Sequence, residues 1–245
     1  MNVFTGELIG TMILVLFGDG VVANVLLAKT KGHNSGWIVI TAGWGFGVAV
    51  GVYVAGWASG GHLNPAVTIG MAALGQLPAA QIPLYLAAQF LGGFLGAILV
   101  WLAYLPHWPQ TEDPVAKLSV FCTVPAIRHT LGNVLCEVIG TAVLLVGVLG
   151  ILNTNNNIGS GVGPYVVGIL VFGIGLSLGG PTGYAINPAR DLAPRIAHAL
   201  LPIPGKGSSD WSYAWIPVVG PLVGGVVGAV LYNCLFSGLL PVAAH

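Results

Sequence analysis

Long apolar stretches alternate with short polar segments along the whole chain. Each apolar stretch is almost free of charged residues, and most reach the length of about 20 residues with which a helix crosses the hydrocarbon core of a bilayer. The pattern predicts an all-α membrane protein. Its six expected spans lie at about 4–28, 37–57, 80–104, 130–152, 164–178 and 213–236, and the longest polar connector at about 106–129.

Two further apolar segments are too short to span a membrane, and both follow the same tripeptide. Asn64-Pro65-Ala66 precedes one that reaches about Leu74, and Asn187-Pro188-Ala189 precedes one that reaches about Leu200. Asn is a favoured N-cap, and Pro suits the first helical position because its missing N–H would have no partner there. Two such half-helices in matching places indicate a pore or transport site at the membrane midplane.

The two halves of the chain repeat. Residues 7–11 reappear as 137–141, residues 91–97 reappear as 223–229, and the two tripeptides lie 123 positions apart in the same order. Because three spans per half is an odd number, the second half enters the membrane from the opposite side, which predicts an inverted repeat. We expect one channel domain over 1–245, with halves of about 1–105 and 130–236 joined by the connector.

Composition supports the membrane as solvent. Only 6% of the residues are charged, against about 25% in soluble domains. The 38 glycines allow helices to approach closely. The formal net charge of zero gives no sign of a nucleic-acid partner. Cys122, Cys136 and Cys234 lack metal-ligand spacing and are interpreted as buried thiols, so we predict neither a metal nor a cofactor.

A loop inside a bilayer must have its backbone polar groups satisfied by protein, or must line a wet cavity. The segment before each tripeptide is therefore expected to present carbonyl oxygens to a narrow lumen. His62 has no other His, Cys or acid at ligand spacing, which disfavours a metal site there. The expected carbonyls belong to Gly60, Gly61 and His62 in the first loop and to Thr182, Gly183 and Tyr184 in the second.

The two tripeptides are expected to meet at the midpoint of this lumen. Each half-helix start carries about half a positive charge. Asn64 and Asn187 can each accept a backbone N–H with the side-chain oxygen and aim the amide NH₂ into the lumen. Such a midpoint donates hydrogen bonds and repels cations, including protons.

Three acids fall inside predicted spans, where ionisable residues are functional or structural by default. Glu7 and Glu137 occupy equivalent repeat positions. They either relay protons in a coupled transporter or, as we prefer, accept backbone N–H groups from the loops. Asp19 has no evident partner. Asp191 either acts as a reactive acid or stabilises the first turn of a helix, and we prefer the second because the helix dipole alone favours an acid there. No nucleophile–base pair suggests an enzyme.

These motifs resemble those of the aquaporin superfamily, and more closely its aquaglyceroporin branch. Two Asn-Pro-Ala loops in inverted halves carry the resemblance over nearly the whole chain, and Arg190-Asp191 is typical of the glycerol branch. The resemblance implies six tilted helices, two half-helices, a homotetramer with one pore per subunit, and cytoplasmic termini in a bacterial cell membrane. The distribution of Lys and Arg alone would place the N-terminus outside, and we follow the resemblance.

The same resemblance implies a selectivity filter at Trp44, Gly175, Tyr184 and Arg190. Water-specific members place His where this chain has Gly175, so Gly175→His is expected to keep water flow and cut glycerol flow. Tyr184 departs from the Phe of the glycerol branch. Its ring is expected to pack near Trp44, with the hydroxyl near the lumen or a neighbouring carbonyl.

The sequence thus predicts a passive channel for glycerol, water and other small uncharged solutes that excludes ions and protons. Alternatives are a water-selective channel, and a channel mainly for urea, dihydroxyacetone or protonated lactic acid. A transporter that uses a buried acid as a proton site is a further alternative.

Overall fold

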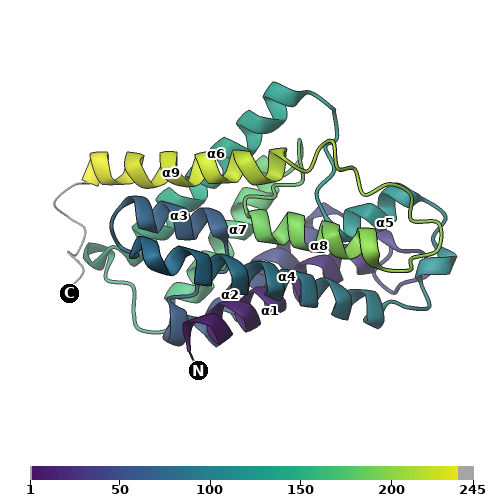
Figure 1. Cartoon of the computed structure of the whole chain (residues 1–245), viewed down its shortest axis with the longest axis horizontal. Coiled ribbons are helices and arrows are strands. Elements are labelled where there is room, and N and C mark those ends of the chain that lie inside the picture. The colour runs from purple at the N-terminus through teal and green to yellow at the C-terminus, as the bar shows by residue number, and fades with distance from the viewer. Residues whose placement is uncertain (1, 237–245) are drawn as a thin grey trace.

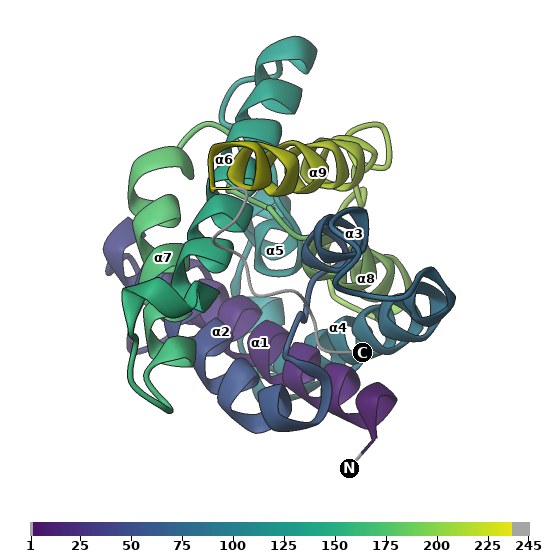
Figure 2. The same ribbon diagram turned by 90° about the vertical axis from the view of Figure 1, so that its left-hand side faces the viewer.

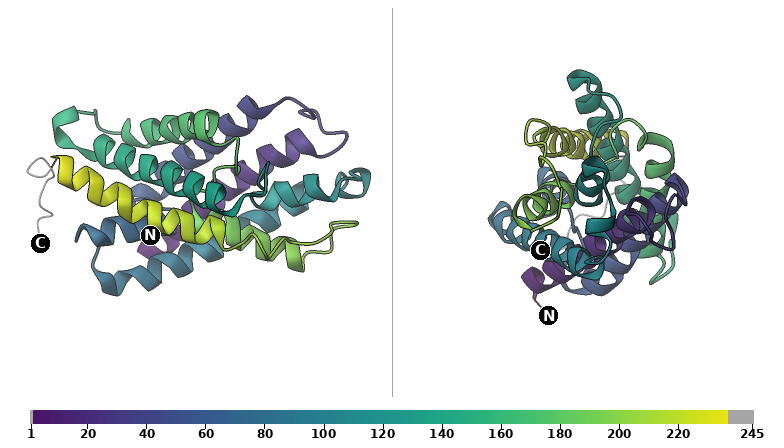
Figure 3. Two further views of the ribbon diagram at one scale, coloured as in Figure 1. Left: turned by 90° about the horizontal axis from the view of Figure 1, so that it is seen from above. Right: turned by 90° about the vertical axis from the view of Figure 1, so that its right-hand side faces the viewer.

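The computed structural model describes residues 2–236, and within them every regular element is helical. Five helices in this part of the chain are long and apolar enough to cross a membrane, and they run along the long axis of the molecule, inclined to one another (Figures 1 and 3). These five are α1 (Val3–Leu26), α2 (Trp37–Ser59), α4 (Ile82–Ala103, after the 3-10 turn η1, Ala79–Gln81), α6 (Thr130–Leu152) and α9 (Ile216–Phe236). The all-helical membrane fold is confirmed.

The sixth span, α7 (Gly163–Leu178), is shorter than the others. Its 16 residues extend about 24 Å at the rise of an α-helix, less than the roughly 30 Å of a hydrocarbon core. Each of the six predicted spans falls on a helix, with ends that differ by at most three residues. The short η3 turn (Thr154–Asn156) lies in the polar linker before α7.

The connector at 106–129 is folded, where the sequence suggested only a polar link. It contains the 3-10 turn η2 (Trp108–Gln110) and helix α5 (Pro114–Phe121). Asp113 caps α5 by accepting the N–H of Val115 at 2.8 Å, and Phe121 stacks on the buried ring of Trp108. Asp followed by Pro before an apolar run is the same start signal that marks the half-helices.

The two half-helices are α3 (Pro65–Ala73) and α8 (Pro188–Leu200), and Asn64 and Asn187 are their N-caps. Each half-helix packs against a long helix from the other half of the chain: α3 lies against α9, and α8 against α4 (Figure 2). The interleaving brings the starts of both half-helices into the middle of the molecule.

The long helices of the two halves pack in matching ways through matching glycines. Gly92 of α4 meets the carbonyl of Leu8 in α1, and Gly224 of α9 meets the carbonyl of Val138 in α6. Both contacts leave no room for a Cβ atom. Small residues at such crossings let membrane helices approach closely. The packing has the symmetry that the sequence repeat predicts, and the bounds of the two halves stay a prediction.

Candidate functional site

The two Asn side chains fasten the two loops to one another. Each side-chain oxygen accepts a backbone N–H of its own half-helix, at 2.8 Å for Asn64 and 3.0 Å for Asn187. Each amide then donates across the centre: Asn64 to the carbonyl of Ile186 at 2.7 Å, and Asn187 to the carbonyl of Leu63 at 2.8 Å.

These cross-links differ in part from the expectation that both NH₂ groups face the lumen. An amide NH₂ carries two donors, and one of each pair is used between the loops. Both Asn residues still line the central cavity, so the second donor of each remains for a solute.

The carboxylate of Glu7 holds the first loop from behind. It is fully buried and accepts the backbone N–H groups of His62 at 2.9 Å and Leu63 at 2.7 Å. Ser59 and Gln89 donate to the same carboxylate at 2.6 and 2.7 Å. Each of these four hydrogen bonds is donated to the Glu7 carboxylate. This arrangement favours a role in supporting the loop over a role in relaying protons.

Glu137 holds the second loop in the equivalent way. It accepts the backbone N–H groups of Ala185 at 3.0 Å and Ile186 at 2.9 Å, and the hydroxyl of Thr182 at 2.7 Å. The repeat spacing of 123 relates Ala185 and Ile186 to His62 and Leu63. Both acids therefore bind the same two backbone positions of their loops.

The loop backbone is strained beside each tripeptide. Leu63 and Ile186, the residues just before the two Asn, have φ angles of 51° and 43°, and Tyr184 has 40°. Positive φ is a genuine outlier for a β-branched residue such as Ile186. Such strain persists only where surrounding contacts over-determine the backbone. The N–H of Ile186 is held by Glu137 and its carbonyl by Asn64.

A cavity of about 400 Å³ runs past this junction. One wall is apolar and comes from the long helices and α3; the other is the polar backbone of the two loops. The apolar wall includes Val48, Val52, Val67, Met71, Leu144, Val148, Val167 and Val171, and the loop wall includes Gly60, Gly61, His62, Leu63, Tyr184, Ala185 and Ile186.

The cavity wall shows which expected loop residues reach the lumen. Gly60, Gly61, His62 and Tyr184 are among its lining residues, whereas Thr182 and Gly183 are not. The sequence interpretation missed one lining residue of the first loop and two of the second: Leu63, Ala185 and Ile186. The spacing of 123 could have found the latter two, because it relates 183–186 to 60–63.

Trp44 and Arg190 meet at one end of the cavity. The Arg190 guanidinium lies over the Trp44 ring, with 3.9 Å between its Cζ atom and the ring centroid. Both residues line the cavity although most of each side chain is buried. A cation over an indole face is electrostatically favourable, and the contact leaves N–H donors beside an aromatic surface.

Tyr184 lies over Gly175 and contacts Trp37, which the sequence interpretation did not foresee. A Cβ atom at Gly175 would be 2.7 Å from the Tyr184 Cζ atom and 2.9 Å from its hydroxyl oxygen. Trp37 packs edge-on against the Tyr184 ring at 5.9 Å and donates its indole N–H to the Gly175 carbonyl at 2.9 Å. Gly175 itself is not among the lining residues of the cavity.

The Tyr184 hydroxyl is buried and has no hydrogen-bond partner among the described residues. The neighbouring carbonyl that we expected as its partner is therefore not used, and the phenol is turned toward α7. Any side chain at position 175 has to displace the Tyr184 ring.

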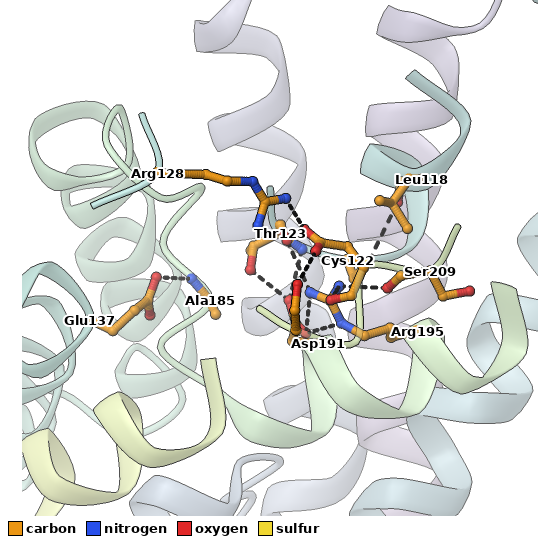
Figure 4. A network of polar contacts seen from close by, with 11 residues as sticks. Leu118, Cys122, Thr123, Arg128, Glu137, Ala185, Asp191, Arg195 and Ser209 are labelled. Carbon is orange, nitrogen blue, oxygen red and sulfur yellow. Dashed lines mark hydrogen bonds and ion pairs between the residues drawn. The ribbon is translucent and has the colours of Figure 1, made fainter. Parts of the chain in front are cut away.

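Asp191 is engaged in a closed polar network beside the half-helix (Figure 4). It accepts the N–H and the hydroxyl of Thr123 at 2.7 and 2.6 Å. It also forms an ion pair with Arg195 at 2.9 Å, in which both side chains are fully buried. The contacts tie α8 to the folded connector, so Asp191 is not a free reactive acid.

Among the described residues, no group of three or more His, Cys, Asp or Glu side chains is arranged to hold a metal ion. His62 instead places its Nδ1 atom 3.2 Å from the hydroxyl of Thr68 and packs its ring against Tyr85. Of the thiols expected to be buried, Cys122 is buried, Cys136 is half-buried and Cys234 is exposed, so the expectation was wrong for Cys234.

Comparisons with known proteins agree over almost the full chain. A family model described as "Major intrinsic protein" matches residues 1–232. The "Probable glycerol uptake facilitator protein" of Thermotoga maritima is 63% identical, over 96% of this chain and 100% of the relative. The "Glycerol uptake facilitator protein" of Bacillus subtilis is 58% identical, over 97% of this chain and 86% of the relative. The X-ray structure of the aquaglyceroporin from Plasmodium falciparum superimposes with a TM-score of 0.86 at 32% identity, covering 97% of each chain.

Asn187→Asp is expected to destabilise the protein and to weaken cation exclusion. The change removes the donor to the Leu63 carbonyl and adds a negative charge where two half-helix starts meet. Leaving a buried carbonyl unpaired costs about 1–3 kcal/mol. Thermal unfolding and cation flux through membrane-inserted protein measure the two effects. Asn157→Asp, on an exposed linker residue, is the control, and wild-type values for both variants would contradict the central position of Asn187.

Gly175→Ala is expected to lower glycerol flux relative to water flux by about tenfold, the equivalent of about 1.4 kcal/mol. The new methyl group would press the Tyr184 ring toward the cavity. Gly173→Ala is the matched control, because it lies on the same helix and a Cβ there meets nothing within 4 Å. The fluxes are measured by stopped-flow light scattering. If the two variants behave alike, Tyr184 does not rest on Gly175 in the membrane.

Proposed function

The chain belongs to the major intrinsic protein family, whose members are membrane channels and not enzymes, and on that premise we propose that it is a passive channel for glycerol. Water and other small uncharged solutes share the path, and ions do not. One observation carries the proposal: the cavity is lined both by apolar helix side chains and by strained loop backbone, and the two loops are cross-linked by Asn64 and Asn187, which also line it.

Glycerol suits such a two-sided path. Its carbon skeleton can slide along the valine-rich wall while its hydroxyls exchange hydrogen bonds with loop carbonyls and with the free amide donors of Asn64 and Asn187. Conduction requires several weak binding sites in close succession, because tight binding at any one site would stop the flow. We assign the constriction of this path to Trp44, Tyr184 and Arg190, with Gly175 as the platform behind Tyr184.

Exclusion of cations follows from the charges around the midpoint. The N-terminal ends of α3 and α8 face the junction, each with about half a positive charge. Arg190 adds a full positive charge beside the constriction. A cation or proton that entered here would exchange the oxygen acceptors of bulk water for hydrogen-bond donors of the protein. The free-energy barrier to its passage is therefore high.

We also propose a homotetramer, with one pore in each subunit, in a bacterial cell membrane, and cytoplasmic termini. The support is the resemblance of the two-loop architecture to aquaglyceroporins. The proposal about the termini concerns residue 1 and residues 237–245, which lie outside the described residues.

Glycerol uptake by proteoliposomes tests the function. Purified protein is reconstituted, and swelling after glycerol, urea and sorbitol gradients is followed by stopped-flow light scattering, with protein-free liposomes as the control. We expect fast, non-saturating glycerol flux and fast water flux, and much slower sorbitol flux. Glycerol flux equal to that of protein-free liposomes would contradict the proposal.

Tyr184→Phe is expected to leave the flux ratios of glycerol, urea and lactic acid within about twofold of wild type. The hydroxyl that it removes is buried and turned toward Gly175, and it has no partner within residues 2–236. Loss of an unpaired polar group costs little. Tyr213→Phe, whose hydroxyl is also buried and unpartnered but lies outside the cavity lining, is the matched control. A changed ratio in Tyr184→Phe alone would mean that the hydroxyl reaches the solute.

A further inference from the structure

Asp19 is an acid in the middle of the fold that neither the loops nor the half-helices use. It lies in α1, it is fully buried, and neither of its carboxyl oxygens has a hydrogen-bond donor among the described residues. An unpaired buried charge is costly, and an ionisable residue inside a membrane span is a candidate for function. The residue therefore requires a partner.

The other buried charges leave one candidate for that partner. Asp191 and Arg195 form an ion pair with each other. The remaining N–H groups of Arg195 donate to backbone carbonyls, including those of Ser209 and Thr123 at 2.9 and 3.0 Å. That pair is saturated. Of the other buried cations in the part of the chain that the structure describes, Lys117 donates to the Pro204 carbonyl, whereas Arg190 lies over the Trp44 ring and has no carboxylate in contact.

The Trp44 ring lies beside both Arg190 and the helical turn that carries Asp19. Gly18, next to Asp19, packs against the edge of the ring so closely that a Cβ atom would overlap it. Arg190 lies over the face of that ring. Asp19 therefore follows directly on a residue that contacts the ring on which Arg190 rests.

A third polar group in this neighbourhood lacks a partner. The indole N–H of Trp44 is buried and donates to no described residue. The six-membered-ring edge of Trp44 faces Gly18, so its indole N–H lies on the other side of the ring from the turn that carries Asp19. A buried water is held by two to four polar groups, and beside this edge the Asp19 carboxylate and the Arg190 guanidinium can supply them.

We propose that Asp19 is the counter-charge of Arg190, joined to it through a buried water, and that it positions the guanidinium against Trp44. The inference rests on the proposed function, since it explains how one wall of the constriction is held. With Asp19 ionised, the charges of Asp19, Arg190, Asp191 and Arg195 sum to zero. The N–H donors of Arg190 then stay turned along the Trp44 face. Without it, Arg190 swings toward acceptors in the lumen and binds solute hydroxyls more tightly.

Four proteins test the pairing: wild type, Asp19→Asn, Arg190→Gln and the double variant. We expect Asp19→Asn to lower the ratio of glycerol flux to water flux by about two- to tenfold when Arg190 is present, and by less than twofold in the Arg190→Gln background, as coupled neighbours behave. Asp19→Glu, which keeps the charge, is expected to restore most of the ratio. Thr11→Val is the matched control, because it removes another buried, unpartnered polar atom of α1 without changing charge.

Two outcomes of the flux measurements would overturn the pairing. One is an equal loss from Asp19→Asn in both backgrounds, which marks a structural role. The other is an unchanged flux ratio in Asp19→Asn together with loss of uptake driven by a pH gradient, which marks a proton site.

Thermal unfolding of the same four proteins gives a readout that does not depend on glycerol conduction. Each single neutralisation is expected to lower the melting temperature, and the double variant is expected to recover part of the loss. Additive losses would overturn the pairing. Absence of glycerol flux in the wild type would overturn the proposed function alone, because water flux and unfolding still report on the pair.

Discussion

The structure depends on one constraint: loop backbone placed inside a bilayer must find hydrogen-bond partners within the protein. Two buried carboxylates, Glu7 and Glu137, meet it by accepting consecutive N–H groups just before each tripeptide. The two Asn amides then bind the carbonyls that those strained turns present. An apolar side chain in place of either acid would leave two buried N–H groups unpaired. This is the physical reason for an acid in each of two spans that are otherwise apolar.

From that constraint the remaining features of the site follow. Because each half-helix packs on a long helix from the other half, the loops arrive from opposite ends and their half-helix starts face each other. The loop wall then supplies polar groups along a path whose other wall is apolar. Arg195 and Asp191 secure α8 through a buried ion pair, and we propose Arg190 and Asp19 as the second pair.

The sequence predicted much of this because its strongest signals are local. Apolar length located six helices, and Asn before Pro located both half-helix starts. The same rule applied to Asp113-Pro114 would have located α5. Side-chain direction was harder to predict. The orientation of Tyr184 depends on Trp37, which is far from it in the chain, and on the absence of a side chain at Gly175. The lining residues of the second loop were only partly predicted. Residue types suggested carbonyls at Thr182 and Gly183, whereas the repeat spacing of 123 relates the lining residues 60–63 of the first loop to 183–186.

Simultaneous measurement of proton and glycerol movement tests the central claim most directly, because a lumen held open by opposed half-helix starts must separate the two. Proteoliposomes containing a pH-sensitive dye are given an inward proton gradient and a potassium diffusion potential, and glycerol-driven swelling is recorded on the same preparation. We expect rapid glycerol entry, while the internal pH changes no faster than in protein-free liposomes. Acidification that rises with the amount of protein would contradict the claim.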